Sequence, residues 1–167
     1  MKEVAPDEFF NRFKPEKCVF VISVDTKGKP SGMVAGWITR CSSEPPLLAV
    51  ALWKGGYTHR LIRQSKEFVI AVPNKGLEKD LLLFGSTHGD KVDKFRETGI
   101  ETIPAKHVRS PLLKKATANL ECALVKEVDS GDHIIFIGKI LAAHCNSGKK
   151  VLMNMGKKNG KRQFKEF

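Results

Sequence analysis

A short segment in the first half of the chain combines the residue types that bind phosphate. It reads Lys54-Gly55-Gly56-Tyr57-Thr58-His59-Arg60 and leads into a helix predicted at 58–65. The first N–H groups of a helix have no intrahelical acceptor, and the helix dipole attracts anions to that end. A Thr58 hydroxyl that caps the helix, together with Lys54 and Arg60, would add a donor and positive charge. The pattern predicts a phosphate site, while a capped helix with a solvated basic face is the alternative.

A second segment could hold a flat ligand against the backbone. It reads Ser31-Gly32-Met33-Val34-Ala35-Gly36-Trp37-Ile38-Thr39-Arg40. The two glycines lack a Cβ and therefore permit close approach, and Trp37 could flank a ring of the ligand. The alternative is that Trp37 belongs to the core and that both glycines mark β-bulges.

The third candidate is a histidine at the end of a predicted hairpin. A tight turn at 130–132 precedes His133, and this turn would hold the imidazole at the mouth of a pocket, although a turn histidine is often only exposed. The signatures G-x-G-x-x-G, G-x-x-x-x-G-K-[ST], H-E-x-x-H and G-x-S-x-G do not occur. Neither a Rossmann nicotinamide site nor a P-loop is therefore expected.

Strands dominate the elements that must position these residues. Apolar and β-branched runs predict strands at 18–24, 31–39, 47–52, 67–72, 118–128 and 133–138. Short helices are predicted at 7–13, 58–65, 77–84 and 90–97, the last with Asp90 as its cap and Gly99 at its end. Because helices do not alternate regularly with strands, a closed or nearly closed antiparallel barrel is predicted rather than a doubly wound α/β sheet.

Composition indicates a single domain over 1–167. The chain is 41% hydrophobic and 28% charged, with no internal repeat or linker. The net charge of +11 favours anionic partners. Much of the excess lies in a basic C-terminal tail at about 147–167, which is expected to be solvated or partly mobile.

Hydropathy and cysteine spacing predict the cellular location and the state of the thiols. No apolar stretch is long enough to cross a bilayer, and the N-terminus lacks a secretory signal, so a cytoplasmic location without membrane contact is expected. The four cysteines, which are widely scattered, are expected to be free thiols, and no spacing predicts a metal site. They are Cys18, Cys41, Cys122 and Cys145.

The order of the motifs resembles the flavin reductase-like FMN-binding split-barrel family, and within it the flavoredoxin group. The shared pattern is Gly-x-x-x-Gly-Trp-x-Thr at 32–39, Pro45-Pro46 before a buried strand, Lys-Gly-Gly-Tyr-Thr-His at 54–59, Glu-Phe-Val-Ile at 67–70, and Gly-Asp-His at 131–133 with Phe-Ile-Gly after it. The resemblance runs from about Lys17 to about His144. It implies a mainly β fold, a six-stranded antiparallel Greek-key split barrel with short peripheral helices. It also implies a homodimer that binds FMN near the subunit interface.

Carried over by position, the resemblance assigns most of a flavin site. The isoalloxazine ring and ribityl chain would be lined by Met33, Trp37, Ile38, Thr39 and Arg40. The phosphate would be held by Lys54, Tyr57, Thr58 and His59. The stretch at 83–95 resembles the family's Gly-x-x-Ser-Gly and Asp-Lys-Phe region, but Thr87-His88 interrupts it. Gly85, Ser86 and Lys94 are therefore secondary candidates.

The resemblance also implies an activity. His133 would position the nicotinamide of NAD(P)H, and hydride would pass through bound FMN to free flavin, a ferric complex or a protein acceptor. The same residues fit an FMN electron carrier, reduced by a partner protein, whose basic surface docks an acidic electron-transfer protein. A nucleic-acid-binding barrel is a third interpretation of the charge, but it calls for aromatic residues among the basic ones. The basic tail offers only Phe164 and Phe167.

Overall fold

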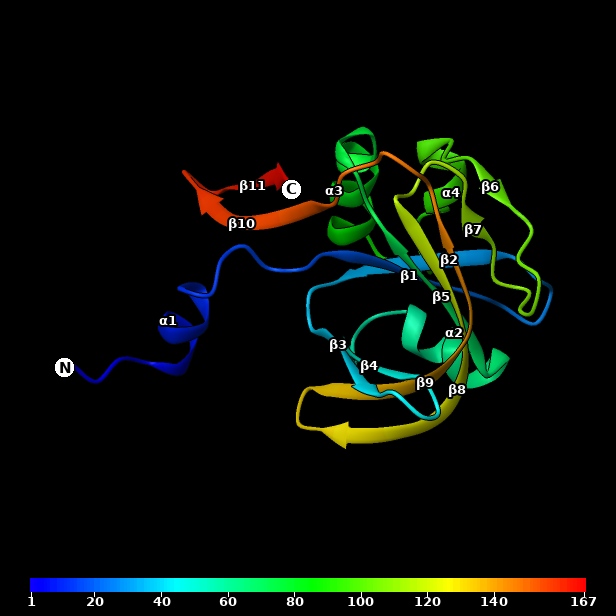
Figure 1. The fold of residues 1–167 in the computed structure, drawn as a ribbon, viewed down its shortest axis with the longest axis horizontal. Coiled ribbons are helices and arrows are strands. Elements are labelled where there is room, and N and C mark those ends of the chain that lie inside the picture. The colour runs from blue at the N-terminus through cyan, green and yellow to red at the C-terminus, as the bar shows by residue number, and fades with distance from the viewer.

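One antiparallel sheet of seven strands carries most of the chain (Figure 1), and the computed structural model describes all residues from 1 to 167. Across the sheet the strand order is β2-β1-β5-β8-β9-β4-β3. The prediction of a mainly β chain with antiparallel pairing is confirmed. Along the chain these strands are β1 (Val19–Val24), β2 (Pro30–Ala35), β3 (Ile38–Ser42), β4 (Leu47–Trp53), β5 (Glu67–Val72), β8 (Ala118–Ser130) and β9 (His133–Cys145).

The predicted count of six strands is wrong because the strand expected at 31–39 is two strands. It breaks at Gly36 and Trp37, and its halves, β2 and β3, lie at opposite edges of the sheet. Three residue steps separate Ala35 from Ile38, which limits their distance to roughly 10 Å. The sheet must therefore curl until its edges approach one another. No ladder of hydrogen bonds joins β2 to β3, so the sheet is not a closed barrel.

Strand β1 is buried on both faces because the curled sheet has a core on either side of it. Phe20 and Ile22 point into the cluster on the outside of the curl, where α3 and the C-terminal hairpin cover the sheet. Val19 and Val21 point into the interior cluster. Alternate residues of a strand face opposite sides, and all six residues of β1 are buried. The central strand is therefore apolar throughout.

Short helices close the ends and outer face of the sheet. Helix α2 has the bounds predicted for it, and α1 contributes no buried residue and stands away from the sheet (Figure 1). No helix is long and apolar enough to span a membrane. The helical elements are α1 (Pro6–Asn11), α2 (Thr58–Ser65), the 3-10 turn η1 (Lys75–Leu77), α3 (Glu78–Ser86) and α4 (Lys94–Thr98).

Two predicted helix caps are wrong. Tyr57, not Thr58, occupies the cap position of α2, and no side chain accepts a hydrogen bond there. Helix α4 begins later than predicted, and its cap is Asp93, whose carboxylate accepts from the N–H of Arg96 at 3.2 Å, rather than Asp90. Gly99 ends α4 in the left-handed conformation, as predicted.

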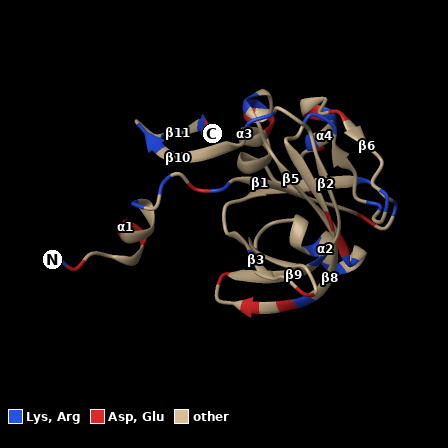
Figure 2. Ribbon diagram, in the orientation of Figure 1, with Lys and Arg blue, Asp and Glu red and all other residues tan.

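The lysines of the basic tail are exposed, as predicted, but residues 152–166 form a hairpin that is anchored to the core. Its strands are β10 (Leu152–Lys158) and β11 (Lys161–Glu166), and its lysines and arginine are seen in Figure 2. Leu152 is fully buried in the core, and Asn154 is 4% exposed. The backbones of Glu16 and Asn154 exchange two hydrogen bonds of 2.9 Å. The hairpin therefore ties the C-terminal segment to the residues that precede β1.

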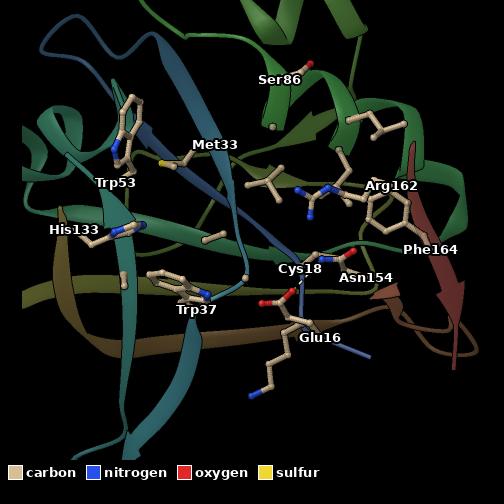
Figure 3. A pocket seen from close by; sticks show the side chains of 18 residues that line it. Glu16, Cys18, Met33, Trp37, Trp53, Ser86, His133, Asn154, Arg162 and Phe164 are labelled. Carbon is tan, nitrogen blue, oxygen red and sulfur yellow. Dashed lines mark hydrogen bonds between the residues drawn. The ribbon is translucent and has the colours of Figure 1, made fainter. Parts of the chain in front are cut away.

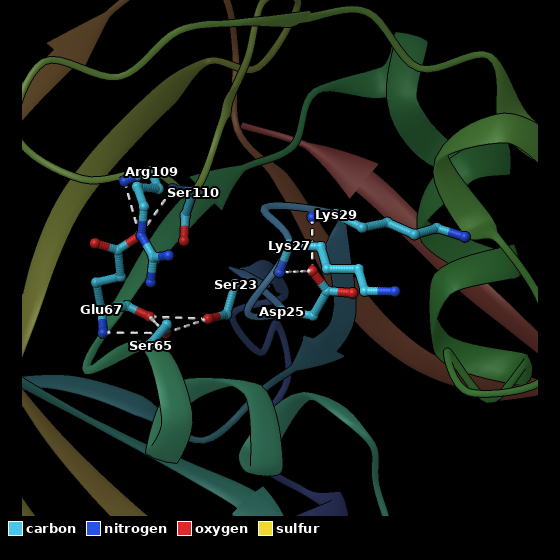
Figure 4. Close-up of polar contacts among 8 residues, drawn as sticks. All are labelled: Ser23, Asp25, Lys27, Lys29, Ser65, Glu67, Arg109 and Ser110. Atoms are coloured by element: carbon cyan, nitrogen blue, oxygen red, sulfur yellow. Dashed lines mark hydrogen bonds and ion pairs between the residues drawn. The ribbon is translucent and has the colours of Figure 1, made fainter.

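Two carboxylates hold the long connection from α4 to β8, which carries β6 (Thr102–Ile103) and β7 (Leu112–Leu113). Glu67 Oε1 accepts from the N–H groups of Arg109 and Ser110 at 2.7 and 3.1 Å (Figure 4). Glu121 is fully buried and accepts from the N–H groups of Lys106 and His107. Burial acts to raise the pKa of Glu121, but these donors and His144 outweigh it and hold the pKa below its usual range. The connection is therefore fixed by charge-assisted hydrogen bonds.

Candidate functional site

A cavity of about 450 Å³ opens beside β2, α3 and the C-terminal hairpin (Figure 3). Four side chains surround one end of it: Met33 from β2, Trp37 from the break before β3, Trp53 from the end of β4 and His133 from the start of β9. Trp37 and Trp53 are 61% and 48% exposed. Exposed indoles at a concave site supply apolar, polarizable surface for a flat aromatic ligand.

Strand pairing explains why these residues meet. Trp53 and His133 are direct partners across β4 and β9. The rings of Trp37 and His133 lie with their centroids 4.5 Å apart and their planes at 35°. The backbone of Trp37 joins the same place, since its carbonyl accepts from the N–H of Ala51 at 2.9 Å. The cavity end is thus built where the two edges of the curled sheet converge.

The imidazole of His133 is oriented by its neighbour in sequence. Its Nδ1 lies 2.6 Å from Oδ1 of Asp132, and this contact is the main reason why the pKa of Asp132 lies below its usual range. An ionised carboxylate only accepts hydrogen bonds, so Nδ1 carries the proton. Nε2 of His133 has no partner within the chain and is therefore free to form a hydrogen bond with a ligand.

A smaller cavity of about 160 Å³ adjoins the first and shares Met33, Trp53, Gly85 and Ser86 with it. Its other lining residues include Tyr57 and Thr58 at the start of α2, residues that follow α3, and Lys94. The first N–H groups of α2 have no intrahelical acceptor, and no side chain caps them. This end is therefore suited to an anion.

Lys94 supplies a buried positive charge to the smaller cavity. It is 3% exposed, and its Nζ donates to the carbonyls of Gly32 and Phe84 at 2.9 and 2.7 Å. It forms no ion pair with a carboxylate, and burial lowers its pKa to about 8. A buried cation without a counter-charge is unfavourable alone. An anion bound in this cavity would stabilise it.

Five residues inferred from the sequence line neither cavity. Ile38 packs against the interior core. Thr39 and Arg40 are exposed on β3 and donate to main-chain carbonyls nearby. Lys54 forms an ion pair with Asp129 at 2.8 Å. His59 is buried, which lowers its pKa, so its imidazole is neutral and offers no positive charge to a phosphate.

The structure brings the other eight candidates together. The larger cavity takes Trp37 and His133, the smaller takes Tyr57, Thr58 and Lys94, and Met33, Gly85 and Ser86 belong to both. Sequence analysis missed Cys18, Asn154, Arg162 and Phe164, which line the opposite end of the larger cavity. The alternation of Leu152 with Asn154 was a strand signal in the tail, but the surrounding lysines obscured it.

Comparison with known proteins identifies the class to which this fold and site belong. Residues 15–161 match the flavin reductase like domain family, and the chain belongs to that family. An uncharacterised protein of Archaeoglobus fulgidus is 43% identical over 113 residues, which are 68% of this chain and 64% of that protein. The NADH-dependent FAD reductase of Streptomyces globisporus is 30% identical over 73% of this chain and 68% of its own length. The matched region spans less than two thirds of the Archaeoglobus relative.

Solved structures agree with this assignment. The NADH:FAD oxidoreductase of Streptomyces globisporus C-1027 superposes with a TM-score of 0.85 at 26% identity, covering 100% of this chain and 98% of that one. The flavoredoxin of Desulfovibrio vulgaris (Miyazaki F) superposes with a TM-score of 0.84 at 24% identity, covering 100% and 93%. The chain therefore has the fold of flavin reductases and flavoredoxins, the family that the motif order indicated.

Proposed function

We propose that this protein binds FMN and uses it to pass electrons from NAD(P)H to an acceptor such as free flavin or a ferric complex. The observation that carries the proposal is the pair of adjoining cavities. One has exposed indoles that suit a flat ring system, and the other contains both Lys94, a buried lysine without an ion pair, and the uncapped start of helix α2. A flavin mononucleotide combines a flat ring and a phosphate at matching ends.

The residues divide the work of such a site. Lys94 and the first N–H groups of α2 would bind the phosphate. Trp37, Trp53 and Met33 would pack on the ring system and exclude water from it. When bound, FMN supplies the redox chemistry, since it accepts a hydride and releases electrons to an acceptor. Asp132 would hold His133 so that Nε2 orients the amide of a nicotinamide.

The donor set fits the phosphate of FMN better than the uncharged riboflavin. The smaller cavity offers one buried ammonium and main-chain N–H groups but no carboxylate partner for either. Purified protein is expected to be yellow and to release FMN on denaturation. Both tryptophans of the chain line the larger cavity, so FMN should quench their fluorescence. A colourless protein whose tryptophan emission is unaffected by micromolar FMN would contradict the proposal.

A second candidate is an FMN electron carrier reduced by a partner protein. It is favoured by the basic hairpin, which borders the cavity through Arg162 and carries several exposed lysines (Figure 2). Positive surface beside a redox group would steer an acidic partner. The two functions differ in their response to NAD(P)H. A carrier would keep its flavin oxidised through minutes of excess NADH and NADPH but would be reduced by dithionite.

His133 provides the test of the reductase function. His133→Ala removes no phosphate donor, so FMN should stay bound, while reduction by NAD(P)H should slow by roughly 10–100-fold through lost positioning. Stopped-flow bleaching of the flavin band measures this rate. His107→Ala is the matched control, because His107 is exposed and lines neither cavity. Equal rates in wild type and His133→Ala would exclude His133 from nicotinamide binding.

We also propose that the protein acts as a homodimer. Strands β8 and β9 expose several apolar side chains: Val128 pairs with Ile135, and Val125, Val128 and Leu141 are 58%, 37% and 38% exposed. Apolar strand surface of this kind is usually covered by a partner. Light scattering should give twice the chain mass of 18.6 kDa. A monomer at micromolar concentration, with no change in Val128→Glu, would contradict this assignment.

A further inference from the structure

The larger cavity has a second polar end, opposite the indoles, to which the proposed flavin contacts assign no role. It lies where Cys18 meets Asn154, Arg162 and Phe164 of the C-terminal hairpin (Figure 3). Arg162 and Phe164 are two residues apart on β11, so their side chains leave the strand on the same side. Figure 3 shows the guanidinium of Arg162 directed into the cavity.

Arg162 is a cation without a partner. The carboxylate that shares its end of the cavity is Glu16, whose Oε2 accepts from Nζ of Lys14 at 2.6 Å and from Nδ2 of Asn154 at 3.0 Å. The charge of Glu16 is therefore balanced by Lys14. The guanidinium of Arg162 forms neither an ion pair nor a hydrogen bond within the chain.

Cys18 supplies no counter-charge to Arg162 either. Its Sγ donates to the carbonyl of Leu152 at 3.3 Å. Burial raises the pKa of the thiol to about 11, although Arg162 acts to lower it. The thiol is therefore uncharged at neutral pH, and the carboxylate at this end of the cavity, Glu16, is already paired with Lys14. An anionic group of a ligand would complete this end of the cavity.

We propose that Arg162 receives the phosphate groups of the nicotinamide dinucleotide that reduces the flavin, and thereby sets the preference of the site for phosphorylated donors. This inference rests on the proposed function. The flavin phosphate belongs to the smaller cavity, whose lining does not include Arg162, so Arg162 serves a second anion. A guanidinium binds phosphate through two parallel N–H donors. A free flavin nucleotide presents the same chemistry, and the experiment separates the two.

Equilibrium binding of ADP-ribose to the FMN-loaded protein tests the inference, because this probe carries the pyrophosphate but neither nicotinamide nor flavin. Isothermal titration should show Arg162→Ala weakening ADP-ribose about tenfold or more, as expected for loss of a charged hydrogen bond, and Arg162→Lys weakening it less. The control is Lys161→Ala, which removes the same charge from the neighbouring position of β11 without touching the cavity. It should change the affinity less than about twofold.

A donor comparison gives a second readout. NADH and 1-benzyl-1,4-dihydronicotinamide share the reacting ring, but only NADH carries phosphate. In Arg162→Ala the preference for NADH over the benzyl compound should fall about tenfold, and in Lys161→Ala it should not change. A fall in both donors alike would indicate distorted flavin rather than lost phosphate recognition and would overturn the inference.

Three further outcomes overturn it. In the first, the wild-type protein does not bind ADP-ribose. In the second, Arg162→Ala and Lys161→Ala bind ADP-ribose with equal affinity. In the third, Arg162→Ala still binds ADP-ribose but no longer binds free FMN as a second ligand. The last outcome would assign Arg162 to a flavin acceptor. If the proposed function itself is wrong, the wild-type protein will bind no FMN. Binding of ADP-ribose can still be measured on that protein, so the two failures can be told apart.

Discussion

The two ends of the site that are proposed to bind anions differ in how their cations, Lys94 and Arg162, are held. Lys94 is buried, bonded to two main-chain carbonyls and fixed among residues of β2, α3 and α4. Arg162 is exposed, unpaired and carried by a two-stranded hairpin at the rim. A desolvated, preorganised cation binds tightly and releases slowly, whereas a solvated one binds weakly and exchanges. If both ends bind anions as proposed, we expect slower release of the ligand at the Lys94 end than at the Arg162 end.

Removal of the buried cation, Lys94, should cause the largest loss of ligand affinity. Lys94→Met is expected to weaken FMN by about 2–4 kcal/mol, because a charge-assisted contact in a dry cavity is lost. Fluorescence quenching of the two tryptophans measures the affinity. The melting temperature of the apo protein should change little, because removal of a buried charge offsets the loss of the donor to the carbonyls of Gly32 and Phe84. Lys91→Met, at a nearby exposed lysine, is the control and should bind FMN normally.

The second-largest effect is expected from pH, which should change the affinity for FMN at the Lys94 end but not the affinity for ADP-ribose at the Arg162 end. The free protein loses the Lys94 proton as pH rises through its pKa of about 8, so FMN affinity should be highest below that value and fall by up to about tenfold per pH unit above it. A guanidinium stays charged throughout this range, so ADP-ribose binding should be flat. Titrations from pH 7 to 9.5 check both. In Lys94→Met the slope for FMN should vanish, and a persisting slope would point to another group.

The smallest effect is expected from Lys54. Its ammonium is already paired with Asp129, and it lines neither cavity. Lys54→Ala should therefore change FMN affinity less than about twofold, since exposed ion pairs contribute little. Direct titration with FMN decides the point. A tenfold loss would mean that Lys54 leaves Asp129 for the phosphate and that the start of α2 binds it with two cations.

Local patterns predicted the elements better than the contacts between them. The bounds of α2 and the position of β5 follow from helix breakers and β-branched runs close to each residue in the sequence. The break at Gly36 and Trp37 could not be predicted because it depends on where β2 and β3 pair, at opposite edges of the sheet. Lys54 and His59 have the right types for a phosphate site, but Asp129 and burial determine their roles. Such partners are distant in sequence.

The C-terminal tail shows most clearly that contacts between distant residues could not be predicted from local sequence. Its lysines predict a solvated end, yet Leu152 and Asn154 are buried against residues at the other end of the chain. Net charge reports on surface potential and not on fold. Leu152 and Asn154 anchor the hairpin, and their hydrogen-bond partners are Cys18 and Glu16, which precede the first strand.

The bond between Asn154 and Glu16, which spans 138 positions of the chain, has a consequence for synthesis of the protein. A nascent chain that ends at β9 contains the whole seven-stranded sheet and the smaller cavity, but one wall of the larger cavity is missing. That wall forms only after residues up to Phe164 have left the ribosome, which takes a few seconds more at about 5–20 residues per second. The smaller cavity can therefore form before β10 and β11 are made, whereas the larger cavity gains its second wall only when this hairpin has folded against Glu16 and Cys18.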